Sequence, residues 1–391
     1  MAYSVTSWFV DQAASENPPI KRQFLIGTSD YSGFVLGWPT ISSQWDELRP
    51  NNVTLNLANE DQTFNFFKTA KTNLQASCSI KYGFTHPTSG DELLTLFSGT
   101  VQEIQFENAS ATLRLNDKVQ KLSDRIVGTT NSAAVFSSAT MLPSDIAWTV
   151  CTCYGGFSSI ASTSNPDIDY TAFLEWAQVF SDNAVYVGAN YKGQNVTEVL
   201  RGVMRNTQSA AYLNNDKIKF SRWTYSSTSI VNLTGDHIKS LRAKIRADAM
   251  INRQWVEFDY RVESNYWNKS IFSQNTASVN SFGIRENVIR DENFWYVGSN
   301  HAMNLADRSL RVNANPYEEV TVEAILKPLY QTVGDTLAAY DPHLEITEGW
   351  RIMGMSINID TGGVTMNIDG SQINTPFILD VSSLDGTDLL L

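Results

Sequence analysis

The fold of this chain is decided by residues 97–122, which read FSGTVQEIQFENASATLRLNDKVQKL. Around a polar turn at 107–110, apolar residues occupy alternating positions: Ile104, Phe106, Ala111, Leu113 and Leu115. Because successive side chains of a strand point to opposite faces, this alternation predicts two half-buried strands joined as a hairpin. Asp117 follows directly and can cap a short helix that holds Val119 and Leu122 one turn apart. The stretch therefore predicts a sheet that leads into a helix.

Alternating apolar residues also occur on both sides of this hairpin. Upstream they are Val53, Leu55, Leu57, Leu74, Ala76, Cys78, Ile80 and Tyr82. Downstream the pattern returns at 241–247, 256–262, 320–326, 353–359 and 364–368, the last two joined by a turn at 360–363. One helix, at about 294–308, interrupts the downstream series. These patterns predict two antiparallel β-domains, residues 1–127 and 236–391, the second with one inserted helix.

The middle of the chain, residues 128–235, carries helix signals. Three helices are expected, at 143–153, at 170–180 and from 196 onward. The third is the clearest, because Asn195 can cap it and Glu198 can close a capping box. A hairpin at 212–223 follows. We therefore expect a β-rich α+β fold in which two antiparallel β-domains, each a sheet or a barrel, flank a small α+β module.

Composition limits the function classes. The chain has 391 residues with 41 acidic and 29 basic side chains, a formal net charge of −12, and its aromatic content of 11% is typical of a folded protein. The charge repels duplex DNA and argues against a sequence-reading DNA binder, but a negative wall suits a channel through which nucleic acid slides without sticking. Three cysteines, no signal-peptide pattern and no long apolar run predict a protein made in a reducing cytosol without a membrane span.

The sequence offers little support for catalysis or metal binding. No phosphate loop, dinucleotide fingerprint, zinc-protease motif or nucleophile elbow occurs. The histidines are spread along the chain, at His86, His237, His301 and His343, and we expect surface or core roles for them. Cys151 and Cys153 resemble half of a zinc site, but only Cys78 remains to complete it. We therefore expect no metal and no cofactor.

Three carboxylate pairs invite a glycosidase interpretation, in which one carboxyl is the acid and the other the nucleophile. They are Asp167/Asp169, Glu318/Glu319 and Glu345/Glu348. Asp167 and Asp169 stand where helix caps belong, and Glu319 is next to a strand whose inward face is already taken by Val320 and Val322. We expect these carboxylates to be structural and the protein not to be an enzyme.

A basic stripe is the most specific surface feature. Arg242, Lys244 and Arg246 alternate with the apolar residues of one predicted strand, so they point together from its other face. One interpretation is a solvated face or an edge strand charged against aggregation. The other is an interface to an acidic partner or to another subunit.

Three groups of motifs resemble the tail hub proteins of tailed bacteriophages. The hairpin and Asp-started helix of residues 97–122 resemble the end of the first hub domain. The segments 143–156, 195–200 and 216–220, with the helix around Phe173, resemble the next domain in order and spacing. The stretches 333–337 and 349–352 with the last hairpin resemble the strands that close the second barrel. The resemblance covers most of the chain and rests on the order of short structural motifs.

This resemblance implies a structural role at the tip of a phage tail, in a virion assembled in the host cytoplasm. Three copies would form a homotrimer whose two tube-like barrels per subunit make a pseudo-sixfold ring on the tail tube. The implied partners are the tail tube or distal tail protein, the tape-measure protein, and tip, fibre or plug proteins, while DNA passes through without sequence-specific binding. Some hub proteins carry an appended hydrolase or fibre domain, whereas this chain ends shortly after its last hairpin, which also favours a role without catalysis.

Two other interpretations stay open. The 10 Trp and 15 Tyr residues could stack on sugar rings, as in a receptor- or carbohydrate-binding β-protein of a virion. A glycan-cleaving enzyme would use one of the carboxylate pairs and would lose turnover when Glu345 becomes Gln or Asp167 becomes Asn.

Overall fold

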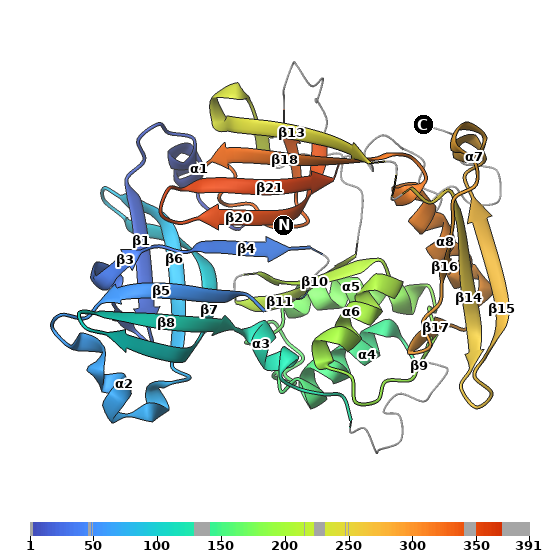
Figure 1. The fold of residues 1–391 in the computed structure, drawn as a ribbon, viewed down its shortest axis with the longest axis horizontal. Coiled ribbons are helices and arrows are strands. Elements are labelled where there is room, and N and C mark those ends of the chain that lie inside the picture. Colours follow the sequence, from blue (N-terminus) through green and yellow to red (C-terminus); the bar gives the residue numbers. More distant parts are fainter. Residues whose placement is uncertain are drawn as a thin grey trace.

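The computed structural model describes residues 3–45, 48, 50–128, 141–214, 216–222, 231–246, 248, 250–339 and 349–369. Two seven-stranded sheets and a group of helices make up most of this part of the chain (Figure 1). Each large sheet is curled, and we call them the first and the second half-barrel. The predicted fold class, two tube-like β-domains together with a smaller α+β module, is confirmed.

The first half-barrel has the strand order β2-β1-β6-β7-β8-β5-β3 and lies at the left of Figure 1. Its strands are β1 (Ile20–Ile26), β2 (Ser29–Asp30), β3 (Val35–Gly37), β5 (Asn52–Ala58), β6 (Ser77–His86), β7 (Gly90–Glu107) and β8 (Ser110–Asp117). Two short helices, α1 (Ser7–Ala13) and α2 (Phe66–Thr69), accompany it. The predicted hairpin is confirmed as β7 and β8, and its inward residues Ala111, Leu113 and Leu115 are fully buried.

Six strands of the second half-barrel follow the order β12-β19-β20-β21-β18-β13, and the seventh, from the N-terminal part of the chain, also pairs with β20. Its strands are β12 (Val231–Leu233), β13 (Ile238–Arg246), β18 (Tyr317–Ile325), β19 (Thr336–Ala339), β20 (Gly349–Asn358) and β21 (Gly363–Asp369). Only the β12–β19 pair is parallel in the sheet as described. The last predicted hairpin is confirmed as β20 and β21. Strand β13 forms one edge of this sheet.

Strand β4 (Thr40–Gln44) crosses from one half-barrel to the other. It comes from the N-terminal part of the chain but pairs with β20, with Ile41 opposite Ile357 and Ser42 opposite Ser356. The alternation in the sequence did not predict this strand. The first 127 residues therefore contribute to both half-barrels, while the exact domain boundaries stay a prediction.

A helical module lies next to the second half-barrel (Figure 1). It contains α3 (Lys118–Ser123), α4 (Pro143–Thr149) with a π-helical turn at Val150–Tyr154, α5 (Tyr170–Asp182), β9 (Val187–Ala189), α6 (Val196–Asn206), β10 (Ser209–Asn214) and β11 (Lys217–Arg222). The expected caps are present, because Asp117 accepts from the Gln120 N–H at 3.2 Å and Asn195 accepts from the Thr197 N–H at 2.9 Å. The capping box with Glu198 is also formed. These helices begin where their local signals predict.

The expectation of a single inserted helix is wrong. Residues 250–314 form an insertion with its own sheet, β14 (Arg253–Arg261), β15 (Tyr266–Gln274) and β16 (Glu286–Ile289), followed by β17 (Phe294–Tyr296), and with two helices, α7 (Thr276–Phe282) and α8 (Ser299–Asn313). Phe294 lies in β17, which pairs with β9 of the helical module, and α8 begins only at Ser299. The predicted strand at 256–262 exists as β14, but it packs against α8 and is not part of the second half-barrel.

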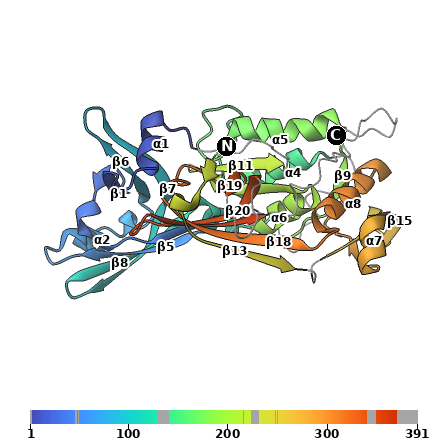
Figure 2. The same ribbon diagram turned by 90° about the horizontal axis from the view of Figure 1, so that it is seen from above.

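Two hydrophobic cores hold these parts together. One core is continuous through both half-barrels and includes Phe24, Leu113, Val322 and Met366. The other joins the helical module to the insertion through Trp176, Phe258 and other residues. Figures 1 and 2 place the first half-barrel and the insertion at opposite ends of the long axis. Since buried apolar surface is the main stabilising term, each core holds its two parts as one unit.

Candidate functional site

The half-barrels and the helical module meet around Trp45, the residue that follows β4. Its backbone N–H donates to the Met353 carbonyl at 2.8 Å, and its side chain is 5% exposed. The Arg351 guanidinium of β20 lies 3.7 Å from the centroid of the Trp45 ring. The ring of Tyr212, from β10, lies 5.4 Å from that of Trp45. Trp45 therefore connects the crossing strand, the second half-barrel and the helical module.

Arg351 is a cation held in an apolar junction. Burial lowers the pKa of Arg351 to about 9, against the opposing influence of Asp369 and Tyr212. Asp369 is its direct neighbour in the register of β20 and β21. At neutral pH the guanidinium stays charged, and the aromatic face and the carboxylate replace part of its lost hydration.

Gly334 makes room for the Trp45 ring. Its φ of +86° lies in the left-handed region, and an added Cβ would lie 2.0 Å from Cζ3 of Trp45. The Gly334 N–H donates to the Ile352 carbonyl at 2.7 Å, so the stretches 333–337 and 349–352 lie side by side. The two C-terminal motifs singled out in the sequence thus come together against a tryptophan from the N-terminal part.

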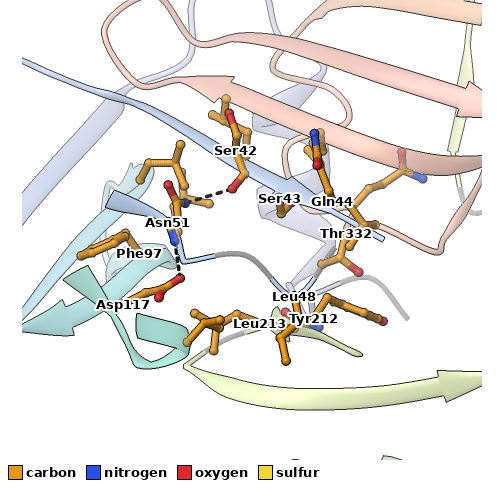
Figure 3. Close-up of a pocket in the computed structure, with 18 of the residues that line it drawn as sticks. Ser42, Ser43, Gln44, Leu48, Asn51, Phe97, Asp117, Tyr212, Leu213 and Thr332 are labelled. Atoms are coloured by element: carbon orange, nitrogen blue, oxygen red, sulfur yellow. Dashed lines mark hydrogen bonds between the residues drawn. The ribbon is translucent and has the colours of Figure 1, made fainter. Parts of the chain in front are cut away.

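A cavity of about 80 Å³ lies at the same junction (Figure 3). The first half-barrel contributes Phe97 and Asp117, β4 contributes Ser42, and the helical module contributes Tyr212. The loop before β19 contributes Thr332. Elements from three parts of the chain therefore surround one small space.

Asp117 is the charged group of this cavity. Its carboxylate accepts from the Asn51 N–H at 2.8 Å as well as capping α3 through Gln120. Burial raises the pKa of Asp117 to about 6, although these N–H donors oppose the shift. The Asn51 side chain in turn donates to the Ser42 carbonyl at 2.9 Å, which ties β4 to the end of β8 (Figure 3).

Two amides give the cavity a polar character. Gln331 is 1% exposed, and neither its Nε2 nor its Oε1 has a hydrogen-bond partner among the described residues. Asn214 Oδ1 is also buried and has no hydrogen-bond partner among the described residues. Both Gln331 and Asn214 line the cavity. An unpaired buried polar group costs about 1–3 kcal/mol, so these amides give the cavity a polar part, whereas residues such as Phe97 and Met355 give it an apolar part.

The faces of the half-barrels opposite the core carry hydroxyls and amides. On the first half-barrel, Thr112 Oγ1 donates to Asn56 Oδ1 at 3.0 Å across β5 and β8. On the second, Thr321 Oγ1 donates to Asn367 Oδ1 at 3.2 Å. Between them, the hydroxyls of Ser42 and Ser356 lie 3.0 Å apart across β4 and β20. These neutral pairs share their faces with charged side chains, among them the exposed Arg114 on the first half-barrel and Arg242 on the second, directly opposite Thr321.

The predicted basic stripe lies on edge strand β13. Arg242 and Lys244 are exposed, and Lys244 is opposite Glu319 in the register with β18. Arg246 belongs to the same strand, but its side chain lies outside the described part. On the other face, which was expected to be buried, Ile245 is 70% exposed. An interface role for Arg242, Lys244 and Arg246 stays a prediction.

The described histidines have structural surroundings. His86 Nδ1 accepts from the N–H groups of Thr88 and Ser89 at 3.1 and 3.0 Å. His301 Nε2 lies 3.2 Å from the Ala184 carbonyl oxygen. His237 ends a short 3₁₀ helix, and His343 lies outside the described residues.

The cysteines and carboxylates form no metal cluster in the described ranges, where no three His, Cys, Asp or Glu side chains gather. Cys78 and Cys151 are buried, and burial raises the pKa of each thiol to about 12, whereas Cys153 is exposed.

Of the carboxylate pairs, Asp167 and Asp169 make contacts that stabilise local structure. Asp169 caps α5, and Asp167 Oδ1 lies 3.3 Å from Lys118 Nζ. Glu319 lies on β18, whereas Glu345, Glu348 and the Glu318 side chain fall outside the described residues.

Sequence reasoning missed the Trp45 junction. The five residues of β4 show too short an alternation to be distinguished from a loop, and Trp45 stands between polar residues. The sequence does single out the motif at 333–337, but Trp45, the residue that Gly334 makes room for, is distant in sequence.

Among the helices of the described residues, none is both long and apolar enough to span a membrane.

Comparison with known proteins identifies the fold. No protein-family model and no curated protein sequence matches the chain. A solved tail protein from Neisseria meningitidis MC58 is similar with a TM-score of 0.59 at 12% identity, over 92% of this chain and 98% of that one. The 43 kDa tail protein of prophage MuSo2 from Shewanella oneidensis gives 0.54 at 12% identity, over 90% and 99%. Prophage tail protein gp18 from Listeria monocytogenes EGD-e gives 0.52 at 14% identity, over 92% and 97%.

Proposed function

The chain has the fold of prophage tail proteins, and we propose that it is a structural hub subunit at the distal end of a phage tail. Three copies form a pseudo-sixfold ring that joins the tail tube to tip or fibre proteins and encloses a channel for DNA ejection. The observation that carries this proposal is the pair of half-barrels, which share one core within a single chain. Three such chains supply six half-barrels, the number that a sixfold tube requires.

The edges of the half-barrels support a ring. A sheet edge left open is a template for pairing with another chain, and head-to-tail contacts close into a ring when the rotation permits. Edge strand β13 exposes Arg242 and Lys244 on one face and Ile245 on the other. Such an edge suits contact with the next copy, in which the basic stripe meets an acidic surface.

The polar faces support a channel wall. The hydroxyl and amide pairs Thr112–Asn56, Thr321–Asn367 and Ser42–Ser356 are neutral, so they offer phosphates no strong ionic bond. The net charge of −12 repels DNA over longer range. Arg114 and Arg242 lie on the same faces and offer phosphates only scattered ionic contacts, so DNA would be retained weakly by such a wall.

The role implies partners and a location. The tail tube or a distal tail protein would bind one rim, and tip, fibre or plug proteins the other, with the tape-measure protein also in contact. The protein would belong to the virion, at the tail tip, after assembly in the host cytoplasm. We assign it no catalytic activity and no cofactor.

Native mass spectrometry and negative-stain microscopy test this proposal. The expected particle contains three chains of 43.6 kDa each and appears as a ring with six lobes. Incubation with purified tail tubes should place one ring at a tube end. A strictly monomeric protein that leaves tube ends bare would count against the hub.

A second candidate is a receptor- or carbohydrate-binding protein of the virion, and the insertion favours it. There Tyr266 is 60% and Phe272 43% exposed. Exposed aromatic rings of this kind can stack on sugars. A glycan array would detect such binding, and silence across the array would remove this candidate.

A further inference from the structure

An open groove lies between the helical module and the insertion. Helix α6 forms one wall, and residues 287–293 of the insertion form the other. The groove has a volume of about 730 Å³, within the range of clefts that bind ligands. Arg201 and Arg205 lie one turn apart on α6, and Arg290 lies on the opposite wall. In a chain with a net charge of −12, three arginines thus gather in one groove.

Two acidic residues, Glu198 and Asp291, also line the groove, and each is held by hydrogen bonds from neighbouring groups. Glu198 accepts from the Asn195 N–H in the capping box of α6. Asp291 accepts from the Asn293 N–H and from the Asn206 side chain, each at 2.9 Å. The salt bridges found among the described residues include none to the three arginines of the groove.

The arginines differ in how firmly they are held. Arg201 Nη2 donates to the Leu48 carbonyl at 2.8 Å, and its Nε is buried with no partner in the described chain. Arg205 and Arg290 are exposed. One guanidinium of the lining is therefore fixed by the chain, while the two others are exposed on opposite walls, where they can meet a ligand.

Strand β16 (Glu286–Ile289) adds a second recognition element to the groove. It is an edge strand of the β15-β14-β16 sheet, and Asn287, Val288 and Ile289 line the groove. An edge strand has backbone N–H and C=O groups on its open side that an extended peptide can pair with.

We propose that this groove binds an extended acidic segment of a partner protein. The segment adds as a strand along β16, and its carboxylates form bidentate hydrogen bonds with Arg205 and Arg290. With three arginines against Glu198 and Asp291, the groove carries a positive excess in an acidic chain, which favours an anionic ligand, and the available strand edge favours a peptide over a nucleic acid. The single aromatic residue of the groove, Tyr191, is buried and offers no face for base stacking. This inference does not depend on the trimer.

Fluorescence anisotropy with the full-length protein tests the proposal. The probe is a labelled ten-residue peptide of alternating Glu and Val, compared with the matching Gln and Val peptide and with a ten-nucleotide oligothymidine. The variant R205E/R290E is compared with K71E/K239E, which changes the charge equally at exposed sites outside the groove. The variant R205K/R290K keeps the charge but cannot form the bidentate fork.

The Glu peptide should bind the wild type and lose at least about tenfold in affinity in R205E/R290E, since hydrogen bonds to charged groups contribute strongly. The control should change by less than about twofold, and the Lys variant should be intermediate. Amide exchange at 286–289 should slow when the peptide binds. The proposal is overturned if the Glu peptide does not bind, if both charge variants lose affinity equally, if β16 gains no protection, or if oligothymidine binds more tightly.

Discussion

The Arg351 guanidinium lies 3.7 Å from the centroid of the Trp45 ring, across 306 positions of sequence. This contact joins the end of β4 to β20 and lies beside Tyr212 of the helical module. A cation over an aromatic face contributes about 0.5–2 kcal/mol, and the burial of the indole adds more. The junction therefore stabilises the arrangement of three parts of the chain at once.

Trp45→Ala should lower the free energy of unfolding by about 3–5 kcal/mol, because it leaves a cavity and removes the aromatic partner of a buried cation. Urea denaturation measures this loss. Trp267→Ala, at a half-buried site on the insertion, is the control and should cost clearly less. Equal losses in the two variants would contradict a special role of the junction.

Gly334→Ala should destabilise the fold by about 2 kcal/mol or more, because the residue has φ +86° and its Cβ would lie 2.0 Å from the Trp45 ring. Gly235→Ala, with no atom within 4 Å of its Cβ, is the control and should change stability by less than about 1 kcal/mol. Thermal melts compare them. When Trp45 is already Ala, Gly334→Ala should cost less stability, because the indole ring that its Cβ meets is gone. If the double variant instead loses the sum of the two single losses, the clash is not the cause.

Asp117 should give the fold a measurable pH dependence. Its folded pKa of about 6 lies above the reference value of 3.8, so the folded state binds the proton more tightly than the unfolded state. Above pH 6 the ionised carboxylate therefore lowers the free energy of unfolding by its full amount, up to about 3 kcal/mol. As the pH falls from 6 towards 3.8 the carboxylate is protonated and this loss disappears. Denaturation of wild type and Asp117→Asn between pH 3.5 and 7 should give a difference that varies in this window, and a constant difference would refute the assignment.

Ile245→Glu should leave the fold intact but prevent assembly of the proposed ring, because the side chain is 70% exposed on edge strand β13. Light scattering of the purified variant would report monomers, while its melting temperature stays within a few degrees of the wild type. Ile160→Glu, at a 50% exposed site in the helical module, is the matched control and should still assemble. If both variants form trimers, β13 is not the subunit contact.

Local signals in the sequence predicted much of the fold. The hairpin around residues 107–110 is specified by alternation and a polar turn, and α6 by Asn195 and Glu198 within four residues of each other. Such elements satisfy their backbone groups with near neighbours, so the sequence signal lies beside the structure that it causes. The sequence placed residues 256–262 in the second β-domain, and this prediction was wrong. The alternation of β14 shows that one of its faces is buried, but it does not show that helix α8 covers that face.

The sequence by itself determined that this is a β-rich chain with two antiparallel β-domains and a capped helical module. Only the tertiary structure decided that β4 crosses to the second half-barrel, that Gly334 and Arg351 meet Trp45, and that Arg290 faces Arg205 across a groove. The physical reason is range. Hydrogen-bonded turns and caps act between residues a few positions apart, whereas strand pairing and side-chain packing join any two surfaces that fit, and no local pattern records which surfaces those are.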